Sequence, residues 1–225
     1  MTTGSTLAAA AALLALLALL ALLPSASIAT TPGPAAGSST PVISAPGKAT
    51  TNVAVDADGT RTLVQSIVVD AELPEVWRAL TTSEGWRGWA APVAWVDFRL
   101  DGIIETSYRR SAQAGDPANI RNRVIAYLPM RMFAIRNVQA PPNAGFDVPT
   151  FQSLHTVVML DATGPRSTRV TFAQPGYRSG EAFDGVFRHF AAGNGWTLEQ
   201  LRKRFIDGPV DWDKRAAEAA AAVRK

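Results

Sequence analysis

The stretch GEAFDGVFRHFAAGNGWTLEQLRKRFIDGP, residues 180–209, decides the fold. Within it, apolar side chains recur every three or four residues, which is the period of a helix with one buried face. The members of this apolar stripe are Phe183, Phe187, Phe190, Leu198, Leu201 and Phe205, with Asn194 among them. Gly208 and Pro209 form a strong stop signal. The stretch therefore predicts one long amphipathic helix from about Gly180 to Asp207.

A polar break interrupts the apolar stripe at Gly193-Asn194-Gly195, while His189 and Trp196 project to the opposite side of the helix. Each glycine in a helix interior costs on the order of 1 kcal/mol relative to alanine. A buried amide that has no partner costs about 1 to 3 kcal/mol. We therefore expect Asn194 either to contact a ligand or to bond a strand carbonyl or a structural water.

Upstream of this helix, the sequence predicts three hairpins. They are Val93–Leu100 with Ile103–Tyr108, Asn119–Tyr127 with Met132–Val138, and Leu154–Leu160 with Thr168–Phe172. Asp101-Gly102 is a strong two-residue hairpin signal, and it would pair Phe98 with Glu105. In that register Glu105 and Ser107 point inward. The alternatives are that a one-residue bulge turns Glu105 to solvent, or that an arginine pairs with it.

The segment before the hairpins predicts one strand and two short helices. Leu63–Val69 is β-rich. Leu73–Leu80 carries Pro and Glu early, where helices favour them. Thr81 and Glu84 form a capping-box pattern that would open the second short helix. The whole order predicts an α+β fold, in which a curved antiparallel sheet wraps around one long C-terminal helix.

This order resembles the helix-grip fold of the START-like, or SRPBCC, superfamily, over about residues 61–207. The closer likeness is to the bacterial branch grouped with the C-terminal domain of the activator of the heat-shock-protein-ninety ATPase. The residues that carry it are Val76–Thr82 with Glu84-Gly85-Trp86 and Trp89, Val96–Arg99 with Asp101-Gly102, Thr168–Thr171, and Gly195–Leu198 with Leu201. The resemblance implies a cavity between helix and sheet that usually takes an apolar small molecule. It is more specific for fold than for function, because the superfamily hosts lipid carriers, cyclases, allergens and hormone receptors.

Seven residues are candidate ligand contacts in such a cavity. They are Asn194, Phe187, Phe190, Glu105, Ser107, Trp89 and Phe146. An inward Glu105 could anchor a ligand hydroxyl or act as a base. Phe146 is the apolar tip of a proline-stiffened loop, residues 139–150, which is either a rim of the site or a surface excursion that Phe146 ties to the core. The aromatic residues suit core packing as well as ligand stacking.

The composition excludes several kinds of site. The 225-residue chain has no cysteine, so disulfides, thiolate nucleophiles and iron–sulfur clusters are excluded. Two histidines, His155 and His189, leave little for a zinc site, and neither belongs to a nucleophile motif. The 22 basic and 19 acidic residues leave too small an excess for a nucleic-acid footprint. No metal, cofactor or nucleic acid is therefore expected, and no catalytic residue is assigned.

The N-terminal 29 residues predict a signal peptide. Residues 7–23 are seventeen consecutive Ala and Leu, and Ser27 and Ala29 suit cleavage after Ala29. An uncleaved anchor is the rival interpretation, because residues 1–6 lack Lys and Arg. As a helix the apolar run would span about 25 Å, just short of the roughly 30 Å hydrocarbon core. Either way the protein is expected to be exported, periplasmic or secreted, and to touch the membrane only through residues 7–23 if they are retained.

The rest of the chain divides by composition into three parts. Residues 30–58 are a predicted linker, rich in Pro, Gly, Ser and Thr over much of its length. Residues 59–208 form the predicted folded domain, and residues 209–225 are an Ala-rich tail that is either a short amphipathic helix or a frayed end.

These features favour a non-enzymatic, exported protein that binds a small apolar ligand between the last helix and the sheet. Two alternatives stay open: a cyclase- or aromatase-like enzyme that uses polar groups such as Glu105 and Asn194, or a partner-binding module with a closed core. A cavity of a few hundred Å³ would favour ligand binding, and a closed core the last class. Chaperone activation is rejected, because an exported protein would not meet a cytosolic ATP-dependent chaperone.

Overall fold

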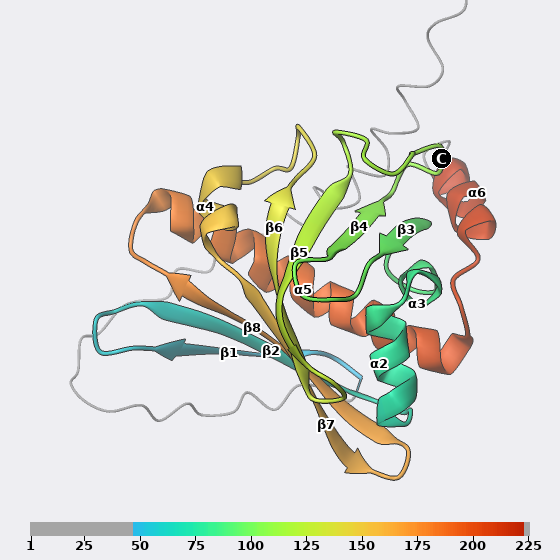
Figure 1. Cartoon of the computed structure of the whole chain (residues 1–225), viewed down its shortest axis with the longest axis horizontal. Helices are drawn as coiled ribbons and strands as arrows, with labels where there is room; N and C mark the ends of the chain where they lie inside the picture. The colour runs from blue at the N-terminus through green and yellow to red at the C-terminus, as the bar shows by residue number, and fades with distance from the viewer. Residues whose placement is uncertain (1–46, 223–225) are drawn as a thin grey trace, which may run out of the picture. The chain divides into compact units, whose positions relative to one another are not determined.

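A computed structural model describes residues 47–222 of the chain (Figure 1). The predicted signal peptide or anchor and the first part of the predicted linker lie outside the described residues. The elements in chain order are β1 (Thr50–Val55), β2 (Arg61–Val69), α2 (Leu73–Thr81), α3 (Ser83–Arg87), β3 (Val93–Val96), β4 (Ile103–Ser107), β5 (Ile120–Leu128), β6 (Met132–Gln139), α4 (Val148–Ser153), β7 (Thr156–Gly164), β8 (Ser167–Tyr177), α5 (Glu181–Asp207) and α6 (Trp212–Ala222). All elements from β1 to α5 belong to one compact unit, and α6 belongs to a second.

Eight strands form one antiparallel sheet, in the order β1-β2-β8-β7-β6-β5-β4-β3. The sheet curves around α5, which crosses one of its faces (Figure 1). The predicted α+β fold with a curved sheet around one long helix is therefore confirmed. Among the described residues, no helix is both long enough and apolar enough to cross a membrane.

The long helix follows the sequence prediction closely. α5 ends at Asp207, and Gly208 after it has a φ of 88°, a left-handed conformation that glycine adopts without strain. Leu198 and Leu201 of its apolar stripe are fully buried against the sheet. The C-terminal half of α5 therefore anchors the sheet, as a stripe of helical period predicts.

Two apolar cores lie between α5 and the sheet. The main core joins α2 and the centre of the sheet to the C-terminal half of α5, and includes Ile67, Val170, Leu198 and Leu201. The second core surrounds the N-terminal half of α5. It contains Leu63, Leu154, Tyr177 and Val186, with Phe146, Phe151, Phe183, Phe187 and Phe190 packed against them. The apolar stripe of α5 thus serves two cores in succession.

The first strand of the sheet lies inside the segment predicted to be a linker. Residues Thr50–Val55 pair with β2, from Thr50 opposite Ser66 to Val55 opposite Arg61. The last three residues of β1 are exposed, so the strand has little of the apolar alternation that identifies a buried strand. Its stability comes from pairing with β2, which a local sequence pattern does not reveal.

The hairpin predicted at Asp101-Gly102 has a different register from the expected one. β3 already ends at Val96, and Glu105 pairs with Trp95 rather than with Phe98. Phe98 instead leaves the strand and packs edge-on against Trp77 and Phe133, at centroid distances of 5.6 and 5.4 Å. Burial of that ring lengthens the connection into a loop, and the predicted register is wrong for this reason.

The new register also turns Glu105 and Ser107 away from α5. Opposite residues of an antiparallel pair share one face of the sheet, and successive residues alternate between faces. Ile104 lies in the main core and Val96, its pair, packs against it. Glu105 and Ser107 are therefore on the outer face, and the predicted inward orientation is wrong.

The other predicted elements are present. The β5–β6 and β7–β8 hairpins pair as expected. β5 keeps its predicted length, whereas β6, β7 and β8 are longer than predicted. α3 also forms, but its N-cap is Thr82, whose hydroxyl accepts a hydrogen bond from the Gly85 amide at 3.0 Å. Thr81, the predicted cap, is the last residue of α2. An extended backbone at Thr82 suits an N-cap, whereas Thr81 is helical.

Candidate functional site

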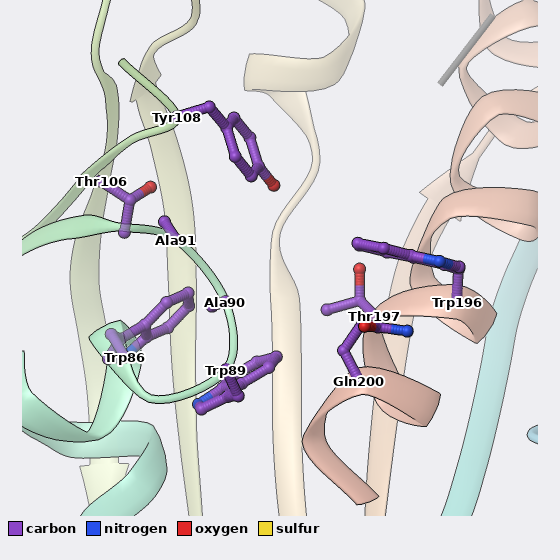
Figure 2. A pocket seen from close by; sticks show the side chains of 9 residues that line it. All are labelled: Trp86, Trp89, Ala90, Ala91, Thr106, Tyr108, Trp196, Thr197 and Gln200. Carbon is purple, nitrogen blue, oxygen red and sulfur yellow. The ribbon is translucent and has the colours of Figure 1, made fainter. Parts of the chain in front are cut away.

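A small pocket lies where α5 faces α3, the segment after it, and β4. Its volume is about 60 Å³. Nine residues line it: Trp86, Trp89, Ala90, Ala91, Thr106, Tyr108, Trp196, Thr197 and Gln200. Figure 2 shows Trp86 and Trp89 on one side of the gap and the three residues of α5 on the other. We call this site the tryptophan pocket.

One wall of the tryptophan pocket is held in place by α2. Trp86 Nε1 donates to the Leu80 carbonyl at 2.7 Å, and Trp89 Nε1 donates to the Ala79 carbonyl at 3.0 Å. The two indole rings also contact each other, with centroids 5.3 Å apart. Both indole N–H groups are therefore used by α2. This wall therefore presents the carbon atoms of its rings to the pocket.

The exposed wall of the pocket combines Trp196 of α5 with Tyr108, which comes from the side of the gap that also carries Thr106 (Figure 2). Trp196 is 39% exposed and Tyr108 is 42% exposed, whereas Trp89 across the gap is 1% exposed. In Figure 2 the rings of Trp196 and Tyr108 both project into the gap. Thr197 beside them donates its hydroxyl hydrogen to the Gly193 carbonyl at 2.9 Å. The pocket thus has one buried, fixed wall and one wall at the surface.

The size of the pocket limits what it can hold. Sites that bury a drug-sized ligand have volumes of roughly 300 to 1,000 Å³. The tryptophan pocket, at about 60 Å³, is smaller than the cavity of a few hundred Å³ that would favour ligand binding by size alone, and it has room for one small chemical group. Tyr108 carries the only ionisable side chain among the nine lining residues. The pocket therefore suits binding of a small group and offers no pair of groups for acid–base catalysis.

Asn194 lies outside this pocket, in a belt of polar side chains between the two cores. Asn194 Nδ2 donates to Gln174 Oε1 at 3.0 Å, and the Tyr177 hydroxyl donates to the same oxygen at 3.0 Å. Gln174 Nε2 in turn donates to Thr156 Oγ1 at 2.8 Å. Burial raises the pKa of the Tyr177 hydroxyl, so it stays a donor. Asn194 thus has a protein partner, as in the second of the two sequence alternatives, although that partner is an amide.

Gln65 forms the other half of the polar belt. Its side chain is buried, and its Nε2 donates to Thr51 Oγ1 at 2.9 Å and to the Ala191 carbonyl at 2.8 Å. Among the described residues, Gln65 Oε1 has no hydrogen-bond partner. The sequence analysis missed Gln65 and Gln174. Alternation along the first strand could have found Gln65, because it shares a face with Leu63 and Ile67.

Glu105 is also held by protein groups. It is 6% exposed on the outer face of the sheet, and its Oε1 accepts from the Gly115 amide and from Asn119 Nδ2, both at 2.6 Å. Arg121 Nε lies 3.4 Å from Oε2. An arginine partner was one of the sequence alternatives. These contacts attach the connection between β4 and β5 to the sheet.

The outer face beside Glu105 is hollowed. An open hollow of about 360 Å³ is lined by Ser83, Trp95, Val96, Asp97, Ile103 and Glu105. Ser107, two residues after Glu105 in β4, accepts a hydrogen bond from the Arg109 amide at 3.3 Å. Both predicted contacts on β4 therefore lie on the side of the sheet away from the tryptophan pocket.

The remaining predicted contacts pack in the second core. Phe146 contacts His189, Phe151 and Phe190, with ring centroids 4.7 to 5.3 Å apart. The loop is thus tied down by Phe146, which was one of its two expected roles. Phe187 packs edge-on against Tyr177 at 5.1 Å. Ligand contact by these residues stays a prediction.

Of the seven predicted contacts, only Trp89 lines the tryptophan pocket. Trp86 and Trp196, which the sequence analysis did not select, complete its aromatic lining together with Tyr108. Trp196 does lie away from the apolar stripe, as predicted. A tryptophan on the polar side of an amphipathic helix is the signal that could have marked it as a site residue. No cluster of His, Asp or Glu in residues 47–222 could hold a metal ion.

A family model described as "Activator of Hsp90 ATPase homolog 1-like protein" matches residues 70–205. Among solved structures, the Aha1 dimer from Colwellia psychrerythraea is 15% identical with a TM-score of 0.50, covering 65% of this chain and 97% of that chain. CalU16 from Micromonospora echinospora is 19% identical with a TM-score of 0.48, covering 78% and 99%. The di-domain ARO/CYC protein BexL, from the BE-7585A biosynthetic pathway, is 15% identical with a TM-score of 0.49, covering 65% and 46%. A search of curated proteins gives no match. At 15% identity, the likeness to the Colwellia structure shows a shared fold alone.

Proposed function

The chain belongs to the family of activator of Hsp90 ATPase homolog 1-like proteins, and from that premise we propose that it is a binding protein for a small molecule. The ligand inserts one group into the tryptophan pocket. A single observation supports this proposal: three tryptophans and a tyrosine, from α3, the segment after it, the end of β4 and α5, converge on one pocket. Their ring carbon, and not a charged group, is the binding surface.

The aromatic lining supplies the binding energy. Burial of apolar surface contributes roughly 25 cal/mol per Å². The rings of Trp196 and Tyr108 supply most of the surface that a ligand can cover, because Trp89 is already buried by the protein. The wall formed by Trp86 and Trp89 is already fixed by its bonds to α2, so a ligand loses little side-chain entropy there. The ligand enters past Trp196 and Tyr108, which form the exposed wall.

The middle of α5 gives the pocket a means to widen. Gly193 and Gly195 stand immediately before Trp196, and glycine weakens a helix interior. The hydroxyl of Thr197 bonds back to the Gly193 carbonyl, a contact that often bends helices. A Cβ added at Gly193 would meet no atom within 4 Å. The space beside Gly193 is open, so this weakened part of the helix interior is where we expect α5 to bend.

We also propose that the protein works outside the cytoplasm. Residues 1–29 support export, by cleavage after Ala29 or by an anchor at residues 7–23. The ligand is then a molecule of the cell envelope or of the medium. The chaperone-activating role that the family description names is not extended to this chain, because that role requires the cytosol.

Native mass spectrometry of the full chain, purified from the envelope or medium of its own host, tests the proposal. A small molecule should co-purify and should be lost in Trp196→Ala. The matched control is Trp95→Ala, because Trp95 lies on the outer face of the sheet. The proposal is wrong if no molecule co-purifies, or if both variants retain it equally.

A partner-binding module is the second candidate, and an exposed apolar tip supports it. The turn between β5 and β6 and the neighbouring loop expose Leu100, Leu128 and Met130 beside Tyr127. Phe98 and Tyr127, whose rings are 5.4 Å apart, join the two loops. This candidate gains if no ligand co-purifies and Leu128→Lys abolishes association with a second protein. Ligand retention that survives Leu128→Lys favours the pocket instead.

A further inference from the structure

We infer that the group recognised by the tryptophan pocket is a methylated ammonium cation, of the kind that choline and its esters carry. This inference rests on the proposed function and names its ligand class. The pocket joins four aromatic rings and a volume suited to one small, compact group. Aromatic rings, tryptophan above all, attract a cation through the negative faces of their π-systems.

The fixed wall of the pocket offers no hydrogen-bond donor to an anion. The indole N–H groups of Trp86 and Trp89 point back to α2 and are bonded there, so they are not donors to a ligand. In Figure 2 the indole nitrogen of Trp89 lies on the side away from Trp196. The Thr197 hydroxyl donates its hydrogen to the Gly193 carbonyl, so toward the pocket its oxygen can only accept. None of the nine lining residues is Lys or Arg.

The same groups separate a methylated ammonium from a primary one. A primary ammonium has three N–H donors, and each needs an acceptor when water is excluded. The side-chain acceptors of the lining are on Thr106, Tyr108, Thr197 and Gln200, and none is on the wall formed by Trp86 and Trp89. A quaternary ammonium has no N–H donor, and its methyl groups suit ring carbon. The pocket therefore favours the methylated cation over the primary amine.

The test compares three small probes on the full chain by isothermal titration calorimetry. They are choline, its uncharged carbon isostere 3,3-dimethylbutan-1-ol, and ethanolamine. Choline and the isostere have the same shape, so a difference between them reports the charge. We expect choline to bind about tenfold more tightly than either of the other two, because desolvated cation–π contacts are worth about that factor.

Two variants localise the effect. Trp196→Leu keeps an apolar side chain, although a smaller one, and removes the aromatic ring, so it should weaken the binding of choline more than that of the isostere. Trp95→Leu, on the outer face, should change neither. A further experiment with phosphatidylcholine vesicles distinguishes the two sources of the methylated ammonium group. If the protein binds the vesicles and free choline competes with that binding, the group belongs to a lipid headgroup. If the protein binds choline but not the vesicles, the group belongs to a free solute.

The outcomes separate the two proposals. Equal affinity for choline and the isostere, lost in Trp196→Ala, overturns the cation and leaves the pocket as a binding site. If no probe binds, but the protein co-purifies with a different molecule that the Trp196→Ala variant loses, the cation is again overturned and the pocket is kept as a binding site. Absence of probe binding together with absence of any co-purified molecule overturns both.

Discussion

Asn194 Nδ2 donates to Gln174 Oε1 across 3.0 Å, so the polar member of the apolar stripe on α5 is bonded directly to the sheet. The same oxygen accepts the hydroxyl of Tyr177. The bond lies between the two cores, where an apolar contact would otherwise continue the stripe. It joins the middle turn of α5 to β8.

Asn194→Leu tests the value of that bond. The substitution removes one of two donors to Gln174 Oε1, and the hydroxyl of Tyr177 keeps that oxygen satisfied. We therefore expect a loss of about 1 kcal/mol in the free energy of unfolding, at the lower end of the cost of a broken buried bond. Urea denaturation of the ligand-free protein measures it. Equal or higher stability with reduced ligand retention would instead assign Asn194 to the ligand.

The two glutamines of the polar belt should respond differently to the same change. Gln174→Leu leaves Asn194, Tyr177 and Thr156 without their shared partner, so a loss of about 3 kcal/mol is expected. Gln65→Leu loses the two hydrogen bonds that Gln65 Nε2 donates. It also removes the buried Gln65 Oε1, which has no partner among residues 47–222, and this gain offsets the loss of the two bonds. Its unfolding free energy should change by less than about 1 kcal/mol. Similar losses in both variants would contradict this account of the belt.

The fold was predictable because its signals are local. The apolar stripe of α5 and the turn signals of the later hairpins lie within short stretches, and each was found from its own residues. β1 has no such signal, because pairing with β2 stabilises it. The β3–β4 register depends on where the ring of Phe98 is buried, against Trp77 and Phe133, which are distant in the sequence.

The tryptophan pocket could not be predicted for the same reason. Trp86 and Trp89 meet Trp196 only after α5 has folded back along the sheet. The sequence analysis did place Trp196 off the apolar stripe. What it lacked was the register between α5 and β8, which Asn194 and Gln174 join.

Glu105→Gln should separate the outer face from the pocket. The glutamine places an N–H₂ group or a neutral oxygen against the donors Gly115 N and Asn119 Nδ2, and it loses the ion pair with Arg121. We expect the protein to lose about 2 kcal/mol of unfolding free energy. Hydrogen exchange should rise in the connection between β4 and β5. Choline affinity should stay unchanged, and a large drop in affinity would place Glu105 in the binding site after all.

Acid should destabilise the protein through its two histidines. Burial lowers the pKa of His189 and of His155 below 6.5, with Arg136 as a second cause for His155. A histidine with a lowered pKa in the folded state resists protonation there, so the unfolded state binds more protons at acid pH. Stability is therefore complete above about pH 6.5 and falls as the pH decreases below it. His189→Phe, beside Phe146 and Phe190, should flatten the melting temperature between pH 7 and pH 5 relative to wild type. An unchanged slope would show that His189 is not responsible.

Gly193→Ala tests whether α5 must bend to admit the ligand. An added Cβ meets no atom within 4 Å at Gly193. The same is true at Gly185, about two turns earlier in the same helix. Alanine should therefore raise the unfolding free energy by about 0.5 to 1 kcal/mol at either site. Only Gly193 adjoins the turn that carries Trp196, so only Gly193→Ala should slow the association of choline in stopped-flow tryptophan fluorescence, with Gly185→Ala at the wild-type rate. If both variants are more stable and bind choline at equal rates, the backbone of α5 stays in place. The pocket then opens through the side chains of Trp196 and Tyr108.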